Sequence, residues 1–299
     1  MIATKAVETA TGVKLQNILF ATDFSPASNL ALPFSVGLAR MFGGRLFAIH
    51  VMEPANYALP PETWQSTDEI LKLEAQELRD RLEREVPRSS TQLLEGEGGL
   101  WPSLAELVKE NDIDLIVVGT RGRTGIGKML LGSHAEELLR HATCPVLTVG
   151  PHVPSQGEPR GKFASILLAT DFGANSAAAA EFAVSMAQET QAKLTVLHTV
   201  KKMAANDLAI PEQFAEADER KLREFVPADG RLSSAPRYIV EEGEPAEKIL
   251  EVARRTNADL IVLGVHKATG VPGAATHLPI ATVHHVVAHA QCPVLTVSR

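Results

Sequence analysis

The residues best suited to chemistry in this chain lie in one glycine-rich stretch, Gly119–Ser133. Five of the fourteen residues from Gly119 to Gly132 are glycines, so the backbone can turn tightly and approach a ligand closely. Gly132 and Ser133 then open a predicted helix, whose free N–H groups and dipole attract anions. Positive side chains stand along the same stretch at Arg121, Arg123 and Lys128. This combination predicts a phosphate-binding loop.

Part of this stretch is close to the P-loop pattern of nucleotide hydrolases. Gly122 to Lys128 reads G-x-x-x-x-G-K, but the next residue is Met129 rather than Ser or Thr. The hydroxyl that would bind magnesium is therefore missing. The stretch also follows the fourth predicted strand rather than the first. We interpret it as a phosphate loop of a different kind.

A second candidate, Asp23, ends the first predicted strand. If the strand order reverses between the first and fourth strands, Asp23 and Gly119 flank one crevice at the carboxyl ends of the strands. Asp23 could bind ribose hydroxyls or a metal there, or it could cap the following helix. Its counterpart Asp171 is kept in the second half of the chain, where the glycine loop is not. Both interpretations stay open.

The chain repeats itself, with two of its repeated blocks spaced 148 residues apart. Three blocks recur in the same order: Ala21–Phe24 and Ala169–Phe172, Asp114–Val117 and Asp259–Val262, and Cys144–Val149 and Cys292–Val297. This period is too long for a solenoid and indicates a duplicated domain. We predict one domain over residues 1–150 and a second over 163–299. The Pro- and Gly-rich stretch 151–162 is predicted to be the linker.

Apolar runs alternate with helical patterns in each half. The expected strands of the first half are 16–22, 45–51, 92–95, 115–119 and 145–149. The expected helices run from Ser25-Pro26 to Gly43-Gly44 with a kink or late start at Pro33, from a capping box at Ser66–Glu69 to Val86, over 103–111 and over 132–142. Continuous apolar runs are typical of strands buried on both faces. The pattern therefore predicts an α/β fold with a doubly wound parallel sheet in each half.

At these residues the chain resembles the universal stress protein family. The ATP-binding pattern of that family is Gly, two residues, Gly, nine residues, Gly, then Ser or Thr, and Gly119, Gly122, Gly132 and Ser133 match it. The resemblance covers both halves and implies tandem five-stranded parallel sheets of order 3-2-1-4-5 with helices on both faces. It also implies ATP in the first crevice, and leaves open whether Mg²⁺ accompanies it. The ligand-binding residues that it implies are Thr22, Asp23, Val51, Val118, Gly119, Arg121, Gly122, Gly132, Ser133, His134 and Ala135.

The second half departs from the family pattern. Lys267 replaces the second glycine, and Ile280 and Ala281 stand where Gly132 and Ser133 stand in the first half. Ile280 has a branched β-carbon where the chain would approach a phosphate, and Ala281 has no hydroxyl. We therefore predict that the second domain binds ATP weakly or not at all.

The preferred function is a nucleotide-binding regulator of a stress response, acting on an unknown protein partner. The alternatives are a slow ATPase or nucleotide-transferring enzyme, and an interaction module without nucleotide. We assign no catalytic residue and no metal site, although His285 and His289 are four apart on a predicted helix and could hold a metal. The resemblance also implies a pseudo-dimer of the two halves within one chain, with a homodimer as the alternative.

Composition excludes several other classes of protein. The formal net charge of −7 disfavours a basic groove for nucleic acid. No apolar run approaches the roughly 20 residues needed to span a bilayer, and residues 1–14 lack the apolar core of a signal peptide. Two cysteines suit a reducing compartment. We therefore expect a cytoplasmic protein that binds neither membrane nor nucleic acid.

Overall fold

The computed structural model describes residues 12–52, 64–95, 99–120, 132–154, 160–200, 212–228, 230, 232–265 and 280–298. Contacts between Cα atoms divide the chain into two compact units. The first unit is built mainly from Lys14–Pro151, and the second mainly from Phe163–Arg299. Arg160 and Gly161 belong to the first unit, and Gly12 and Val13 to the second.

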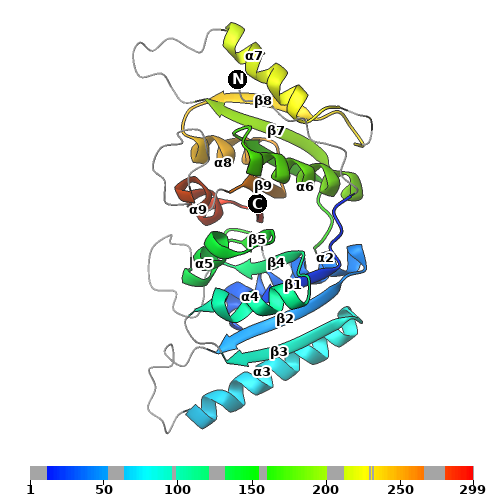
Figure 1. Ribbon diagram of the computed structural model, residues 1–299, viewed down its shortest axis with the longest axis vertical. Helices are drawn as coiled ribbons and strands as arrows, with labels where there is room; N and C mark the ends of the chain where they lie inside the picture. Colours follow the sequence, from blue (N-terminus) through cyan, green and yellow to red (C-terminus); the bar gives the residue numbers. More distant parts are fainter. Residues whose placement is uncertain are drawn as a thin grey trace. The chain divides into compact units, whose positions relative to one another are not determined.

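The first unit contains one parallel sheet. Its elements are β1 (Asn17–Ala21), α1 (Pro26–Asn29), α2 (Leu32–Phe42), β2 (Arg45–Met52), α3 (Trp64–Glu85), β3 (Ser89–Glu95), α4 (Leu100–Glu110), β4 (Leu115–Gly119), α5 (Ser133–His141) and β5 (Val146–Val149) (Figure 1). The strands pair in the order β3-β2-β1-β4-β5, and every pair is parallel. The predicted order 3-2-1-4-5 is confirmed.

The second unit repeats this arrangement. Its elements are β6 (Ser165–Thr170), α6 (Ala174–Thr190), β7 (Lys193–Val200), α7 (Glu212–Phe225), β8 (Arg237–Glu242), α8 (Pro245–Arg255), β9 (Leu260–Gly264), α9 (Ile280–His289) and β10 (Val294–Val297) (Figure 1). The strands pair in the parallel order β8-β7-β6-β9-β10. Because this is again the order 3-2-1-4-5, the prediction of two tandem doubly wound domains is confirmed.

Helices cover both faces of each sheet. In the first unit, α4 packs against α5, while α2 packs on β1 and β2 and α3 on β3. Right-handed crossovers place α2 and α3 on one face and α4 and α5 on the other. The central strands β1 and β4 are consequently buried from Ile18 to Ala21 and from Leu115 to Val118. Burial on both faces explains why their sequences are continuous apolar runs.

The first helical segment is broken in one unit and continuous in the other. In the first unit the Ser25 hydroxyl caps α1 by accepting a hydrogen bond from Ser28 N at 3.2 Å, and Pro26 follows it. The helix then breaks, and α2 restarts with Pro33 in its first turn, as predicted. The residue equivalent to Pro33 in the second unit is Glu181, which keeps its N–H, and α6 runs unbroken over Ala174–Thr190.

Two other predicted helix starts were wrong. Helix α3 already includes Trp64, so Ser66 lies inside the helix and is not its cap. Helix α4 begins at Leu100 rather than at Ser103, because the Glu137 carboxylate accepts hydrogen bonds from Leu100 N at 3.0 Å and from Trp101 N at 2.9 Å. That cap comes from a residue 36 positions along the chain from Trp101, so no local pattern could show it.

The chain segments that precede β1 and β6 are held by helices. Arg160 N donates to Pro33 O of α2 at 2.7 Å, and its guanidinium lies 5.6 Å from the centre of the Phe34 ring. Val13 N donates to the Ser185 hydroxyl of α6 at 2.5 Å. Arg160, at the end of the predicted linker, therefore packs against α2. Among the described residues, no helix combines the length and the apolar character needed to cross a membrane.

Candidate functional site

The candidate site lies where the strand order of the first unit reverses. Strand β1 pairs with β2 on one side and with β4 on the other, and Ala21 lies opposite Val118. The residues that follow β1 and β4 therefore meet at one edge of the sheet. Ligands of doubly wound sheets bind in the crevice beyond the carboxyl ends of the strands at such a point.

A tight turn after β1 forms one side of this crevice. Asp23 Oδ1 accepts a hydrogen bond from Ser25 N at 3.0 Å, and Phe24 between them has a left-handed φ of 57°. The Thr22 hydroxyl lies 3.0 Å from the Ser28 hydroxyl and accepts a hydrogen bond from Phe24 N. Asp23 thus holds the turn, whereas the helix cap itself is Ser25. The ribose-binding role of Asp23 stays a prediction.

The histidine at the end of β2 supports the same turn. His50 Nδ1 lies 2.8 Å from Thr22 O, and its ring centre is 4.9 Å from that of Phe24. In the second unit, His198 makes the same contact with Thr170 O at 2.8 Å, and its ring centre is 4.5 Å from that of Phe172. Because both units contain this arrangement, it belongs to the shared scaffold.

Gly119 is required by packing on the turn after β1. A β-carbon at Gly119 would lie 2.6 Å from Ala27 O, closer than van der Waals contact allows. A β-carbon at Gly264, the equivalent residue of the second unit, would lie 2.6 Å from Asn175 O. The first glycine of the predicted phosphate pattern is therefore explained by the fold in both units. Sequence reasoning missed this role, although the retention of Gly264 was the signal.

We expect Gly119→Ala and Gly264→Ala each to lower the free energy of unfolding by about 1–3 kcal/mol, the usual cost of overpacking. Urea denaturation of the two variants measures this loss. Gly43→Asn is the control, since Gly43 has a left-handed φ of 61° with open space around it and Asn tolerates that conformation. Unchanged midpoints for both alanine variants would contradict the packing role.

The start of α5 forms the other side of the crevice. Gly132 is the extended cap residue, with φ −62° and ψ 146°, and its N–H donates to Thr120 O at 2.7 Å. This bond fixes the start of the helix beside the end of β4. Gly132 provides no side-chain cap, so the first-turn N–H groups of α5 are suited to an anion. The Glu136 carboxylate in that turn is paired with Arg140 at 2.7 Å, which offsets its negative charge.

The structure brings most of the predicted ligand-binding residues of the first domain to this edge of the sheet. The strand ends and the turn supply Thr22, Asp23, Val51, Val118 and Gly119, and the start of α5 supplies Gly132, Ser133, His134 and Ala135. Val51, Val118 and Ala135 have buried side chains, so they can offer a ligand backbone groups or a wall. Arg121 and Gly122 lie outside the described residues.

The equivalent crevice of the second unit is built differently. Asp171 Oδ1 accepts from Gly173 N at 2.8 Å, as Asp23 Oδ1 does from Ser25 N, and it also accepts from the Ser176 hydroxyl at 2.6 Å. The buried side chain of Asn175 donates to Val265 O at 2.7 Å. Helix α9 already includes Ile280, whereas the matching Gly132 lies just before α5. Lys267 lies outside the described residues.

The histidine pair of α9 does not form a metal cluster with other groups of the described chain. The ring centres of His285 and His289 are 4.3 Å apart, and His289 Nδ1 lies 2.8 Å from His285 O. Among the described residues, no three His, Cys, Asp or Glu side chains gather closely enough to hold a metal ion.

The two cysteines, Cys144 and Cys292, are buried and form no disulfide. Burial and the nearby Asp259 carboxylate raise the pKa of Cys292 to about 12. The thiolate form of Cys292 is therefore scarce near neutral pH, which makes this residue a poor nucleophile.

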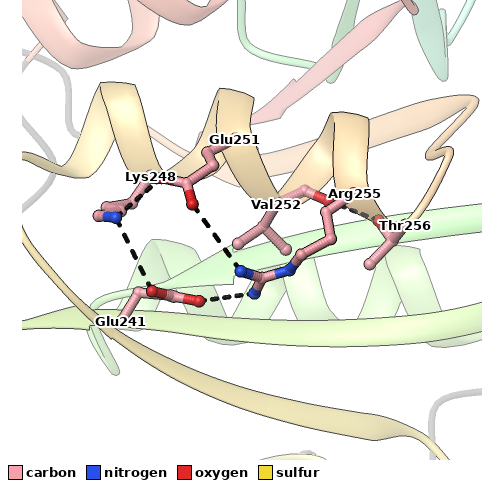
Figure 2. A network of polar contacts seen from close by, with 6 residues as sticks. All are labelled: Glu241, Lys248, Glu251, Val252, Arg255 and Thr256. Carbon is pink, nitrogen blue, oxygen red and sulfur yellow. Dashed lines mark hydrogen bonds and ion pairs between the residues drawn. The ribbon is translucent and has the colours of Figure 1, made fainter.

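Glu241 of β8 belongs to a network of ion pairs with side chains of α8 (Figure 2). Glu241 pairs with Arg255 at 2.5 Å and with Lys248 at 3.9 Å, and Glu251 pairs with both of these cations. The hydrogen bond to Glu251 raises the pKa of Lys248, and Lys248 lowers the pKa of Glu251. These ion pairs are partly exposed and contribute little stability each, and together they connect α8 to the edge strand β8.

The fold and the crevice together define a class, that of tandem doubly wound α/β proteins with a potential ligand crevice at the strand-order reversal. The family model of the universal stress protein family matches residues 14–150 and again residues 162–298. The chain therefore belongs to the universal stress protein family and contains two of its domains in tandem.

Individual relatives agree with this assignment. A universal stress protein of Methanocaldococcus jannaschii is 34% identical over 140 residues, which cover 45% of this chain and 81% of that protein. A universal stress protein of Mycobacterium tuberculosis is 26% identical over 286 residues, covering 86% of this chain and 87% of the relative. The crystal structure of a universal stress protein from Archaeoglobus fulgidus matches with a TM-score of 0.67 at 20% identity, over 96% of this chain and 99% of that one. At that identity the structural match supports the fold alone.

Proposed function

We propose that the first domain binds an adenine nucleotide, ATP in the first instance, and that the chain acts as a nucleotide-dependent regulator in a stress response. The observation that carries this proposal is the bond from Gly132 N to Thr120 O, which holds the start of α5 at the strand-order reversal. A helix start without a side-chain cap binds phosphate well. The proposal rests on this geometry together with the glycine spacing of the sequence.

Other residues at this edge of the sheet are proposed to contact the ribose and the adenine of the nucleotide. We assign the ribose to the Asp23 side and the adenine to the backbone at Val51, on the family resemblance. The phosphates would lie at the start of α5, with Arg121 and Gly122 beside them. Any Mg²⁺ would then arrive with the nucleotide, and the protein would not need to hold it alone.

The second domain is proposed to be a poor nucleotide site. Ile280 lies within α9, and Ala281 offers no hydroxyl at the position of Ser133. The turn after β6 is satisfied by its own side chains, since Asp171 accepts from Ser176. Regulation would then follow from ATP occupancy of the first domain, which stabilises one conformation and changes the binding of a partner protein. We place this role in the cytoplasm, in keeping with two cysteines that form no disulfide.

Native mass spectrometry of gently purified protein, with release and identification of bound small molecules, tests the proposal. We expect one adenine nucleotide per chain. Titration with ATP and calorimetry should give the same stoichiometry. The absence of nucleotide, with none taken up at millimolar ATP, would overturn the proposal in favour of the interaction module. Two nucleotides per chain would overturn the assignment of the second domain.

A further inference from the structure

The carbonyl group that follows the fourth strand has a different hydrogen-bond donor in each unit. In the first unit, Thr120 O accepts from the backbone N–H of Gly132 at 2.7 Å. In the second unit, Val265 O accepts from the side-chain Nδ2 of Asn175 at the same distance of 2.7 Å. The acceptor is thus satisfied by the start of the helix after the fourth strand, α5, in one unit, and by a side chain in the first turn of the helix after the first strand, α6, in the other.

The two carbonyl groups are equivalent in position. Thr120 and Val265 each follow the last glycine of their strand, and both are buried. Thr120 N donates to the last residue of β5 at 3.1 Å, and Val265 N donates to the last residue of β10 at 2.9 Å. A difference in the backbone of the strands therefore does not explain the change of donor.

Positions 27 and 175 are equivalent as well, and each lies in the first turn of the helix that follows the first strand of its unit. Ala27 and Asn175 are 148 residues apart, the spacing of the repeat that contains them. The backbone oxygen of each lies 2.6 Å from the β-carbon position of the glycine that ends the fourth strand, Gly119 or Gly264. An amide side chain at position 27 is consequently placed to reach Thr120 O as Asn175 reaches Val265 O.

We propose that the residue at position 27 or 175 determines which group holds this carbonyl, and hence whether the following helix is fixed at the crevice. Ala27 has no side-chain donor, so Thr120 O is left to Gly132 and the start of α5 is held at the end of β4. Asn175 connects the first turn of α6 directly to the residue that follows β9. In the second unit this carbonyl group is therefore held by a side chain of the same unit.

This proposal makes Ala27 a positioning residue for the nucleotide site, and that part of it rests on the function proposed above. Ala27 does not need to touch the ligand. It acts by leaving the acceptor open for Gly132 N, which orients the first turn of α5. The other part, the choice of donor, is independent of any ligand.

The test places an amide at position 27 and follows the Gly132 amide directly. In the Ala27→Asn variant of the full chain, we expect hydrogen exchange of the Gly132 amide, measured by NMR, to become about fivefold faster, the equivalent of one neutral hydrogen bond. We expect the dissociation constant for ATP, measured by calorimetry, to rise about tenfold. Ala27→Leu is the matched control, because Leu has the same number and branching of side-chain heavy atoms as Asn but no donor, and it should retain the slow exchange of Gly132.

The outcomes separate the inference from the proposed function. A carbonyl oxygen can accept two hydrogen bonds. Unchanged exchange at Gly132 in Ala27→Asn would mean that both donors share the oxygen, and it would overturn the inference even if ATP binds. Equal acceleration in Ala27→Leu would assign the effect to volume and also overturn it. If the wild-type chain takes up no ATP, the proposed function fails, while the exchange measurement still decides the choice of donor.

A second variant tests the same inference in the second unit. Asn175→Leu keeps the number and branching of the side-chain heavy atoms and removes the donor to Val265 O. We expect the midpoint of thermal unfolding to fall by about 2–4 °C, the shift that corresponds to one lost hydrogen bond in a chain of this size. An unchanged midpoint would contradict the role of the Asn175 side chain in connecting α6 to the end of β9.

Discussion

The Gly132→Val variant is expected to bind ATP at least about 100-fold more weakly than the wild-type chain, a loss of about 2.7 kcal/mol in binding free energy. The N–H groups at the start of α5 have no side-chain cap and are suited to a phosphate, and charge-assisted bonds of this kind are about twice as strong as neutral ones. A branched side chain at the cap would occupy the space in which the phosphate must approach these groups.

This variant should leave the fold intact, which makes its result interpretable. Gly132 has an extended backbone, with φ −62° and ψ 146°, that valine adopts readily. Its bond to Thr120 O uses the backbone N–H, which valine retains. We therefore expect an unchanged circular dichroism spectrum and little change in the unfolding midpoint of the ligand-free chain.

Calorimetric titration with ATP provides the measurement, and two further variants serve as comparisons. Ile280→Val changes the equivalent residue of the second domain to the same side chain, and it should leave both affinity and stoichiometry unchanged. Ser133→Ala removes one hydroxyl and should weaken binding by only about 3–10-fold, as expected for one hydrogen bond. Wild-type affinity in Gly132→Val would show that the nucleotide does not use the start of α5.

Much of the scaffold could be predicted from the sequence, because its signals are local or repeated. The strand Leu115–Gly119 was placed with its observed bounds, and the break near Pro33 follows from a missing N–H. Because the chain repeats, the elements predicted in one half could be checked against those predicted in the other. The strand order followed from the family resemblance rather than from periodicity.

The errors occur where a distant residue determines a local boundary. Helix α4 starts three residues earlier than predicted because Glu137 caps it. Strand β3 starts at Ser89 rather than at Gln92, because Ser89 already pairs with Leu46 of β2. Neither contact can be predicted from the residues near the helix or strand start.

The candidate site was predicted by residue type, but the physical role of its parts was not. Gly119 was assigned to the ligand, yet its missing β-carbon is needed for packing, as the retention of Gly264 indicates. Asn175 was not considered, because an asparagine after a strand is ordinary in sequence. Only its bond to Val265 O distinguishes it.

Comparison of the two units separates scaffold from function. Contacts that recur, such as those of His50 and His198, serve the fold whether or not a ligand binds. Positions that differ, such as Gly132 and Ile280, are where the two crevices diverge. A variant at a recurring contact should therefore lower stability in either unit, and a variant at a differing position should change binding in one.

The aspartates at the start of the fourth strands are the recurring contacts with the largest expected effect on stability. Asp114 Oδ2 accepts from Gln16 N at 2.8 Å and from Asn17 N at 2.9 Å. The Asp259 carboxylate accepts from Ala164 N at 2.7 Å and from Ser165 N at 3.0 Å. Each carboxylate thus ties the beginning of the first strand of its unit to the fourth.

Asp114→Ala and Asp259→Ala are each expected to lower the free energy of unfolding by about 2–4 kcal/mol, since each removes two hydrogen bonds to a charged group. Urea denaturation followed by circular dichroism measures the loss. Glu110→Ala, on the exposed end of α4, is the control and should change stability by less than about 0.5 kcal/mol. A loss as small as that of the control would mean that water replaces the carboxylate at both backbone groups.

The contribution of Asp259 to the free energy of unfolding is also expected to depend on pH, in a direction that hydrogen bonding alone would not give. Burial raises the pKa of Asp259 above its ordinary value of 3.8, and the backbone bonds from Ala164 and Ser165 oppose that rise only in part. The folded state therefore binds the proton more tightly than the unfolded state. The contribution of Asp259 to stability is fully present below pH 3.8 and falls as the pH rises through the raised pKa.

The stability difference between the wild-type chain and Asp259→Asn should therefore shrink between about pH 3 and pH 7. If urea titrations across that range show the difference growing, the backbone bonds outweigh burial, and the pKa of this carboxyl lies below 3.8.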